Sequence, residues 1–196
     1  MTDAGLFGPD SVTWRVQGDP SMLLAGLRAL MLQTLHPLAM AGVAQHSDFR
    51  GDPWGRLFRT AEYVAVTTYG TTREAERAGA RVRGVHRSVI GIEPESGLPY
   101  RAGDPELLRW VHCVEVESFL STAVRCGLRL TREEQDSYVD EQRRSAVLVG
   151  LDPANVPGSV AQMRAYYDDV RPRLRATAEA RRGVRFVLAP PMPPKV

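Results

Sequence analysis

Signals that begin and end helices recur along this chain, whereas no segment alternates apolar and polar residues over the length of a strand. Two motifs mark helix starts: aspartate followed directly by proline, and threonine followed three residues later by glutamate. They occur at Asp52-Pro53, Asp104-Pro105, Thr71 with Glu74, and Thr131 with Glu134. Glycine or proline stands where the helical patterns stop. The sequence therefore predicts an all-α fold.

The apolar spacing divides the 196 residues into about six to seven helices of a single globular domain. The predicted helices span residues 21–44, 53–69, 71–89, 104–126, 131–149 and 159–180, with one or two further turns at 183–188. The first is apolar around most of its circumference, which predicts a central position, and Pro37 is expected to kink it. Pro172 is expected to bend the sixth. Residues 1–15 are predicted as a flexible N-terminus and residues 189–196 as a proline-rich tail.

Composition limits the classes of function. Hydrophobic residues make up 43% of the chain, which is enough for a core, and a formal net charge of +2 argues against a nucleic-acid-binding surface. The most apolar stretch, residues 22–43, contains Arg28 and Pro37, so it resembles a buried helix more than a membrane span. The basic residues are arginines apart from Lys195, a bias typical of GC-rich coding sequences such as those of actinobacteria.

The cysteines and the N-terminal sequence indicate the cellular compartment of the protein. A helix over residues 104–126 separates Cys113 from Cys126 by about 20 Å, whereas a disulfide requires Cα atoms within about 7 Å. No basic segment followed by an apolar run opens the chain, so no signal peptide is visible. We therefore expect a cytoplasmic protein with unpaired thiols.

His86 stands in the predicted third helix, on a face that carries mostly apolar and small residues. Its neighbours on that face are Ala75, Ala78, Gly79, Val82, Val85, Val89 and Ile90. A neutral imidazole in such a place can coordinate a metal ion or a haem iron. The spacing alone favours the alternative of a core histidine that is satisfied by a backbone carbonyl, because a single histidine without a partner motif is weak evidence for a metal.

A polar face on the predicted second helix carries Arg56, Thr60, Tyr63 and Thr67. Arg56 and Thr60 can donate hydrogen bonds to a bound anion or an oxygen ligand. A buried guanidinium without a partner is costly, so Arg56 is exposed, paired, or facing a carboxylate such as a cofactor propionate. An exposed, salt-bridged arginine accounts for the spacing equally well.

His112 and Glu115 share one face of the predicted fourth helix. This spacing can hold a metal ion, but di-iron bundles use a glutamate followed by the histidine, in two copies. Here the order is reversed and the motif occurs once. A hydrogen-bonded pair is therefore favoured over a non-haem metal site.

Several ordered segments resemble the bacterial branch of the rubber-oxygenase catalytic-domain family, which includes the latex clearing protein and the MpaB-type oxygenases. The segments are His36-Pro37, Gln45-His46-Ser47-Asp48-Phe49, Asp52-Pro53-Trp54-Gly55-Arg56-Leu57-Phe58-Arg59-Thr60, Val82-Arg83-Gly84-Val85-His86, Tyr100-Arg101-Ala102-Gly103-Asp104-Pro105-Glu106-Leu107-Leu108 and Trp110-Val111-His112. The resemblance covers residues 14–194 and implies an all-α fold around haem b.

The resemblance also implies roles for single residues. His86 matches the histidine that ligates the haem iron, and Arg56 and Thr60 match a distal arginine and threonine. Arg59 stands where a lysine can occupy the sixth iron site, and a protonated guanidinium is a poor iron ligand. No acidic residue lies between Ser21 and Ser47, where rubber oxygenases have a distal glutamate. Family members usually continue with further helices after the proline-rich segment, so the tail is expected to be truncated relative to them.

Together these observations predict a haem-b-dependent oxygenase, an oxidoreductase that acts on a small apolar molecule and dioxygen. His86 is the predicted metal ligand, Arg56 and Arg59 are further cofactor-binding residues, and Arg56 and Thr60 are the predicted catalytic residues. The apolar side chains expected to line the pocket are Leu27, Leu30, Met31 and Leu35. A helical binding or interaction protein without a cofactor is the alternative.

Overall fold

The computed structural model describes residues 3–47, 51 and 53–189 and confirms the all-α class. Its α-helices are α1 (Val12–Gln17), α2 (Met22–Gln33), α3 (Pro37–His46), α4 (Pro53–Tyr69), α5 (Thr72–Ser88), α6 (Pro105–Arg125), α7 (Arg132–Glu141), α8 (Arg143–Leu148), α9 (Val160–Val170) and α10 (Ala178–Leu188). Two 3-10 turns, η1 (Pro153–Asn155) and η2 (Arg171–Arg173), and two short strands complete the described elements. The described helices outnumber the six to seven expected because three predicted helices are each divided and because α1 forms in the segment before the first predicted helix.

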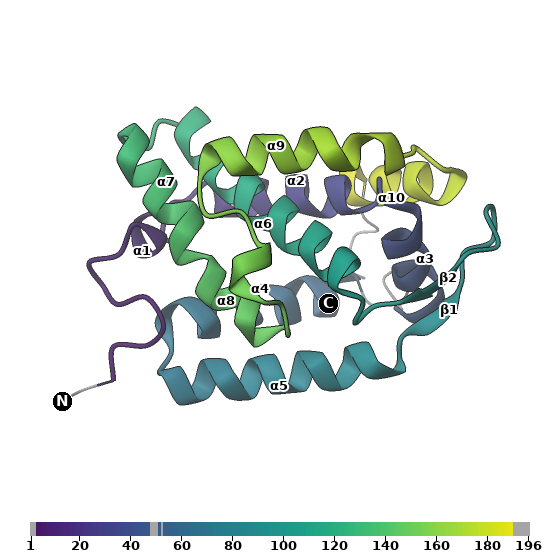
Figure 1. Ribbon diagram of the computed structural model, residues 1–196, viewed down its shortest axis with the longest axis horizontal. Helices are drawn as coiled ribbons and strands as arrows, with labels where there is room; N and C mark the ends of the chain where they lie inside the picture. Colours follow the sequence, from purple (N-terminus) through teal and green to yellow (C-terminus); the bar gives the residue numbers. More distant parts are fainter. Residues whose placement is uncertain (1–2, 48–50, 52, 190–196) are drawn as a thin grey trace, which may run out of the picture.

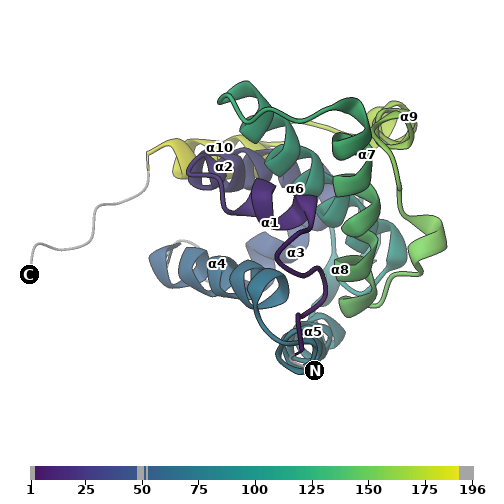
Figure 2. The same ribbon diagram turned by 90° about the vertical axis from the view of Figure 1, so that its left-hand side faces the viewer.

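Helix α6 forms the centre of the fold (Figure 1). Helix α2 packs along it, and its buried positions facing α6 are Ala25 and Ala29, whose small side chains let the two helices approach closely. The α6 side of the core carries Trp110, Cys113 and Phe119. Helix α9 runs along one side of this centre, and the α4–α5 pair lies on the opposite side (Figure 2). The first predicted helix is thus not central over its whole circumference, because Leu23 and Leu24 of α2 are exposed and the central helix is α6.

Prolines divide the chain where kinks were expected. The first predicted helix ends at Gln33, and a new helix begins at Pro37, so that α2 and α3 are bent by 104°. Proline restricts the preceding residue, and His36 accordingly has an extended ψ of 112°. In the sixth predicted helix, Pro172 falls in η2, and α10 starts afresh with Thr177 as its N-cap. A proline at a helix start is favourable, whereas one inside a helix is costly.

A β-hairpin occupies the connection between α5 and α6, where no strand was predicted. Strands β1 (Ile90–Ile92) and β2 (Pro99–Arg101) are antiparallel, with Gly91 opposite Tyr100. Three-residue strands are too short to display an alternating pattern. The hydroxyl of Tyr100 is 2.7 Å from Oε1 of Gln45, to which it donates, and this bond holds the hairpin against α3.

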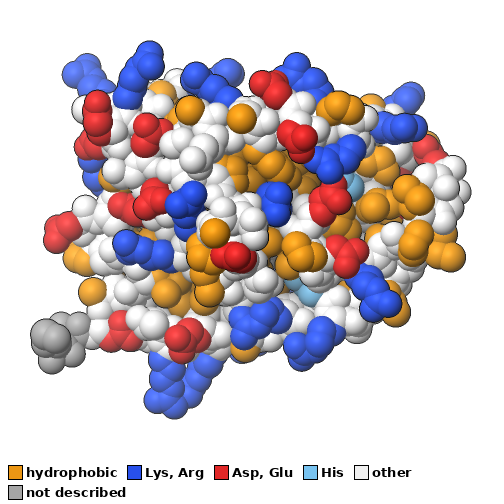
Figure 3. All heavy atoms as spheres, viewed as in Figure 1, with side chains coloured by type: hydrophobic (Ala, Val, Ile, Leu, Met, Phe, Trp, Pro, Cys, Tyr) orange, Lys and Arg blue, Asp and Glu red, His pale blue; other side chains and the backbone are white. Residues whose placement is uncertain are grey.

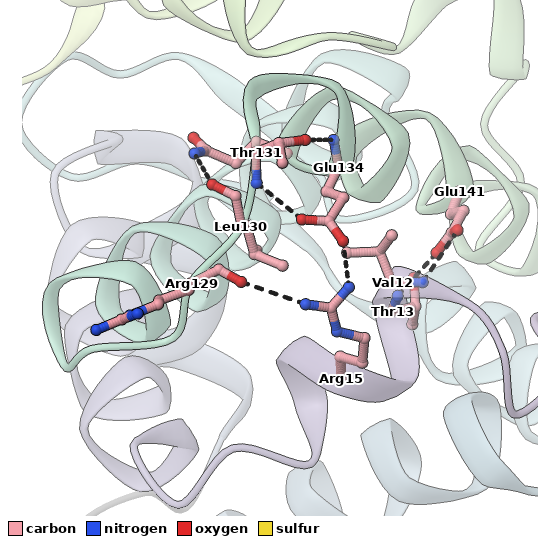
Figure 4. Close-up of polar contacts among 9 residues, drawn as sticks. Val12, Thr13, Arg15, Arg129, Leu130, Thr131, Glu134 and Glu141 are labelled. Carbon is pink, nitrogen blue, oxygen red and sulfur yellow. Dashed lines mark hydrogen bonds and ion pairs between the residues drawn. The ribbon is translucent and has the colours of Figure 1, made fainter.

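Residues 12–15, which the sequence assigned to the N-terminal segment, belong to α1 and are tied to α7 (Figure 4). The backbone N–H groups of Val12 and Thr13 donate to the carboxylate of Glu141, at 3.2 and 2.8 Å. Arg15 forms an ion pair with Glu134, whose carboxylate also accepts from the backbone N–H of Thr131. The predicted capping box at the start of α7 is thereby confirmed, as is the one at the start of α5.

The surface seen in Figure 3 mixes acidic and basic side chains, with apolar side chains gathered between them and over the hairpin. The exposed apolar residues of the hairpin are Ile90, Ile92 and Leu98. Among the described helices, none by itself reaches the length and hydropathy of a membrane span, and the one consecutive pair that reaches them together is the sharply bent α2 and α3. Both cysteines are free, as predicted, with Cys113 buried and Cys126 exposed.

Candidate functional site

Arg56 and Thr60 share a wall of a cavity of about 120 Å³ that is lined by residues of α2, α3, α4, α6 and α10. Their placement follows from the four-residue step that brings both side chains to one face of α4. The lining consists of Leu30, Gln33, Thr34, Ala39, Met40, Val43, Arg56, Leu57, Thr60, Val111, Gly183, Phe186 and Val187. Among the described residues the lining is thus mostly apolar, and the one charged side chain in it comes from α4.

Local hydrogen bonds hold the side chains of Arg56 and Thr60. The guanidinium of Arg56 donates to the hydroxyl of Ser47, and the hydroxyl of Thr60 donates to the backbone carbonyl of Arg56 at 3.0 Å. Desolvation lowers the pKa of Arg56, and the nearby charge of Arg59 lowers it further. An arginine remains charged in spite of such a shift. The cavity therefore has a positively charged, partly desolvated group on one wall.

Arg59 is placed differently from its neighbours. It lies on the exposed side of α4 and is not among the residues that line the cavity. The structure therefore brings Arg56 and Thr60 together, as the sequence predicted, and leaves Arg59 at the surface. Its charge still acts on the guanidinium of Arg56.

His86 lies in the last turn of α5 and is half-buried. Its Nδ1 atom is buried and has no hydrogen-bond partner in the part of the chain that the structure describes. Desolvation lowers the pKa of the imidazole, so the ring is neutral at pH 7. The alternative of a core histidine satisfied by a backbone carbonyl finds no such partner for Nδ1 among the described residues. His46, by contrast, is exposed, with Nε2 3.0 Å from the carbonyl oxygen of Ile90.

His86 is not one of the cavity-lining residues. The helix that carries it, α5, follows α4 directly and packs against it, so the imidazole and the Arg56 wall belong to one helical pair. The predicted site is therefore divided into an imidazole on α5 and a polar cavity wall on α4.

His112 and Glu115 form a second polar region, on α6. Desolvation lowers the pKa of His112 to about 4 and raises the pKa of Glu115 to about 7. Glu115 also adds to the effect of desolvation in raising the pKa of Tyr63 on α4 and of Tyr138 on α7. In the residues that can be described, no group of three or more His, Cys, Asp or Glu side chains is placed to hold a metal ion. The pair thus lacks the third protein ligand that a non-haem metal site would need.

Part of the cavity wall could not be found from the sequence. Leu30 lines the cavity as predicted, whereas Leu27, Met31 and Leu35 are not among the lining residues. The sequence predicted one or two helical turns at 183–188, but nothing in it indicated that this segment, the end of α10, reaches the cavity. The lining residues of α10 are Gly183, Phe186 and Val187. A Cβ on Gly183 would be 3.2 Å from Cγ2 of Thr34, which shows how closely α10 approaches the end of α2.

A family model described as "ER-bound oxygenase mpaB/B'/Rubber oxygenase, catalytic domain" matches residues 14–196. The chain belongs to this family. Membership in the mpaB/rubber-oxygenase family supports an oxygenase activity, which consumes dioxygen and an organic substrate. No curated protein and no solved structure matched the chain.

Proposed function

We propose that this member of the mpaB/rubber-oxygenase family is a haem-b-dependent oxygenase that acts on a small apolar molecule, with His86 as the ligand of the haem iron. One observation supports this assignment above the others: Nδ1 of His86 is buried without a hydrogen-bond partner among the described residues. A buried polar atom without a partner costs about 1–3 kcal/mol. Coordination of the ring to a metal would offset that cost by giving the imidazole a partner.

The chemistry of the imidazole fits a haem iron. Iron coordination requires a neutral ring, and the lowered pKa of His86 keeps it neutral across the physiological range. When bound, haem supplies the redox chemistry that activates dioxygen, which amino-acid side chains do not provide. The residues of the chain would bind and orient the substrate and dioxygen and exclude water from them.

The α4 side chains would carry out the orientation. Arg56 donates to Ser47, and as an arginine has five N–H donors, it could also donate to an oxygen or carboxylate group in the cavity. Thr60 lies one turn away on the same wall and offers the lone pairs of its hydroxyl oxygen. Arg59, at the exposed side of α4, would supply positive charge to the propionates of the cofactor.

The cavity beside Arg56 would receive the substrate. Its lining is mostly aliphatic and includes Met40 and Phe186, so it favours an apolar group and excludes water from it. Five helices contribute this lining, namely α2, α3, α4, α6 and α10.

The absorption spectrum of the purified protein tests the proposal. After expression with a haem precursor or reconstitution with haemin, we expect a Soret band that is lost in His86→Ala. His46→Ala is the matched control, because His46 is exposed and should leave the band unchanged. A protein that takes up no haem after reconstitution would contradict the proposal and favour a binding protein without a cofactor. Stoichiometric iron without porphyrin would instead favour a non-haem iron site that uses His112 and Glu115.

A further inference from the structure

The cavity beside α4 combines one fixed positive charge with an apolar interior. Among its lining residues, Arg56 is charged, and none is acidic. The hydroxyl of Thr34, another polar lining residue, is already engaged with the backbone carbonyl of Met31 at 2.7 Å. Gln33 of α2 adds an uncharged amide, so the positive charge of the lining residues comes from the α4 wall.

The guanidinium is held in position before any ligand arrives. Ser47 accepts from one of its nitrogens, and an arginine has five N–H donors, so the bond to Ser47 does not use all of them. Arg59 lies near enough to affect the guanidinium electrostatically, which adds positive potential at this place. A partly desolvated cation of this kind is stabilised by an anion that shares its environment.

We propose that this cavity binds an organic acid, with its apolar group among the lining side chains and its carboxylate on Arg56. A planar carboxylate suits the fork of a guanidinium, which can donate two parallel hydrogen bonds to it. As a statement about the substrate class this inference rests on the proposed function, whereas the binding itself rests on the cavity alone.

The size of the cavity limits the apolar group. A cavity of about 150 Å³ accommodates a benzene ring, so a cavity of about 120 Å³ suits an alkyl group of similar or slightly smaller size. We expect affinity to rise about fourfold per methylene along a series of straight-chain carboxylates, up to roughly six carbons. Beyond that length the gain should diminish.

Calorimetric titration of hexanoate, hexan-1-ol and hexylammonium at pH 7.5 tests the inference on the full chain. Hexanoate should bind at least about tenfold more tightly than hexan-1-ol, because a hydrogen bond to a charged group is worth more than a neutral one. Hexylammonium should bind more weakly than both. Equal affinities for hexanoate and hexan-1-ol would overturn the inference.

Two variants separate the charge from the cavity. Arg56→Met should lose the preference for hexanoate and leave the affinity for hexan-1-ol within about twofold, since it removes the charge and keeps an apolar stem. Val43→Phe should weaken both ligands, because Val43 lines the cavity and the larger ring would fill it. Arg77→Met is the matched control, because Arg77 is exposed on α5. Hexanoate binding that survives either Arg56→Met or Val43→Phe contradicts the proposed site.

The same samples distinguish this inference from the haem assignment. Circular dichroism shows whether each variant folds. If a variant does not fold, the affinities of the parent chain for hexanoate, hexan-1-ol and hexylammonium test the inference. Hexanoate preference in a protein that takes up no haem supports the acid site and contradicts the haem proposal. A Soret band without any preference for hexanoate supports the haem proposal and contradicts the acid site.

Discussion

Gly79 of α5 lies so close to Leu148 of α8 that a Cβ atom on Gly79 would be 2.6 Å from the carbonyl oxygen of Leu148. The same atom would be 2.8 Å from Cβ of Leu148, so neither the backbone nor the side chain could yield cheaply. Nearby, Arg83 on α5 donates to that carbonyl oxygen. This close contact joins the helix that carries His86 to the α7–α8 side of the molecule.

Gly79→Ala should therefore destabilise the fold by about 1–3 kcal/mol, the usual cost of overpacking. Helix propensity alone would have favoured alanine by about 1 kcal/mol. Gly84→Ala is the control in the same helix, because its Cβ would meet only the flexible end of Arg87 at 3.7 Å. The change in the free energy of unfolding, measured in urea, should have opposite signs for the two variants. Equal stabilisation by both would contradict the close contact between Gly79 and Leu148.

Glu115 should make stability fall as pH rises. Its pKa is raised to about 7 in the folded chain, so the folded state holds a proton that the unfolded state has released above about pH 4.5. The stability that the protonated carboxyl contributes is complete below pH 4.5 and is lost as pH rises through 7. Glu115→Gln should become more stable than the parent by about 1–3 kcal/mol between pH 5 and 8. Glu76→Gln, at an exposed position of α5, should show no such trend in urea unfolding.

His112 should have the opposite dependence. Its pKa is lowered to about 4, so the unfolded state binds a proton below about pH 6.5 while the folded state does not. The stability associated with the neutral ring is complete above pH 6.5 and is lost as pH falls toward 4. His112→Gln should reduce the pH dependence of the free energy of unfolding over this interval. His46→Gln is the control at an exposed position. A parallel pH profile for the parent and His112→Gln would show that the ring is not desolvated.

Glu141 should stabilise the start of α1. Its carboxylate accepts the backbone N–H groups of Val12 and Thr13, which are among the donors that a helix leaves unsatisfied at its first turn (Figure 4). Glu141→Ala should cost about 1–2 kcal/mol, as the loss of an N-cap does. Glu133→Ala, which changes an exposed glutamate of α7, should cost less than 0.5 kcal/mol, as surface changes usually do. Guanidinium unfolding measures both, and indistinguishable midpoints would contradict the role of Glu141.

Local chemistry determined much of this protein. Capping boxes at Thr71 and Thr131, the helical spacing of apolar residues and the position of each proline were sufficient to predict the all-α class and most helix starts. The family segments and the four-residue step from Arg56 to Thr60 were also sufficient to place those two side chains on one face. Such features depend on interactions within a few residues, so they can be read from the sequence.

Tertiary contacts decided the rest. Whether Pro37 kinks a helix or starts another depends on what the bent segment packs against, and the structure turns α3 by 104° relative to α2. One wall of the cavity comes from α10, more than a hundred residues after Arg56 in the chain, where a Cβ on Gly183 would be 3.2 Å from Cγ2 of Thr34. The opposite pKa shifts of His112 and Glu115 likewise arise from desolvation, a property of the surroundings that side-chain spacing does not contain.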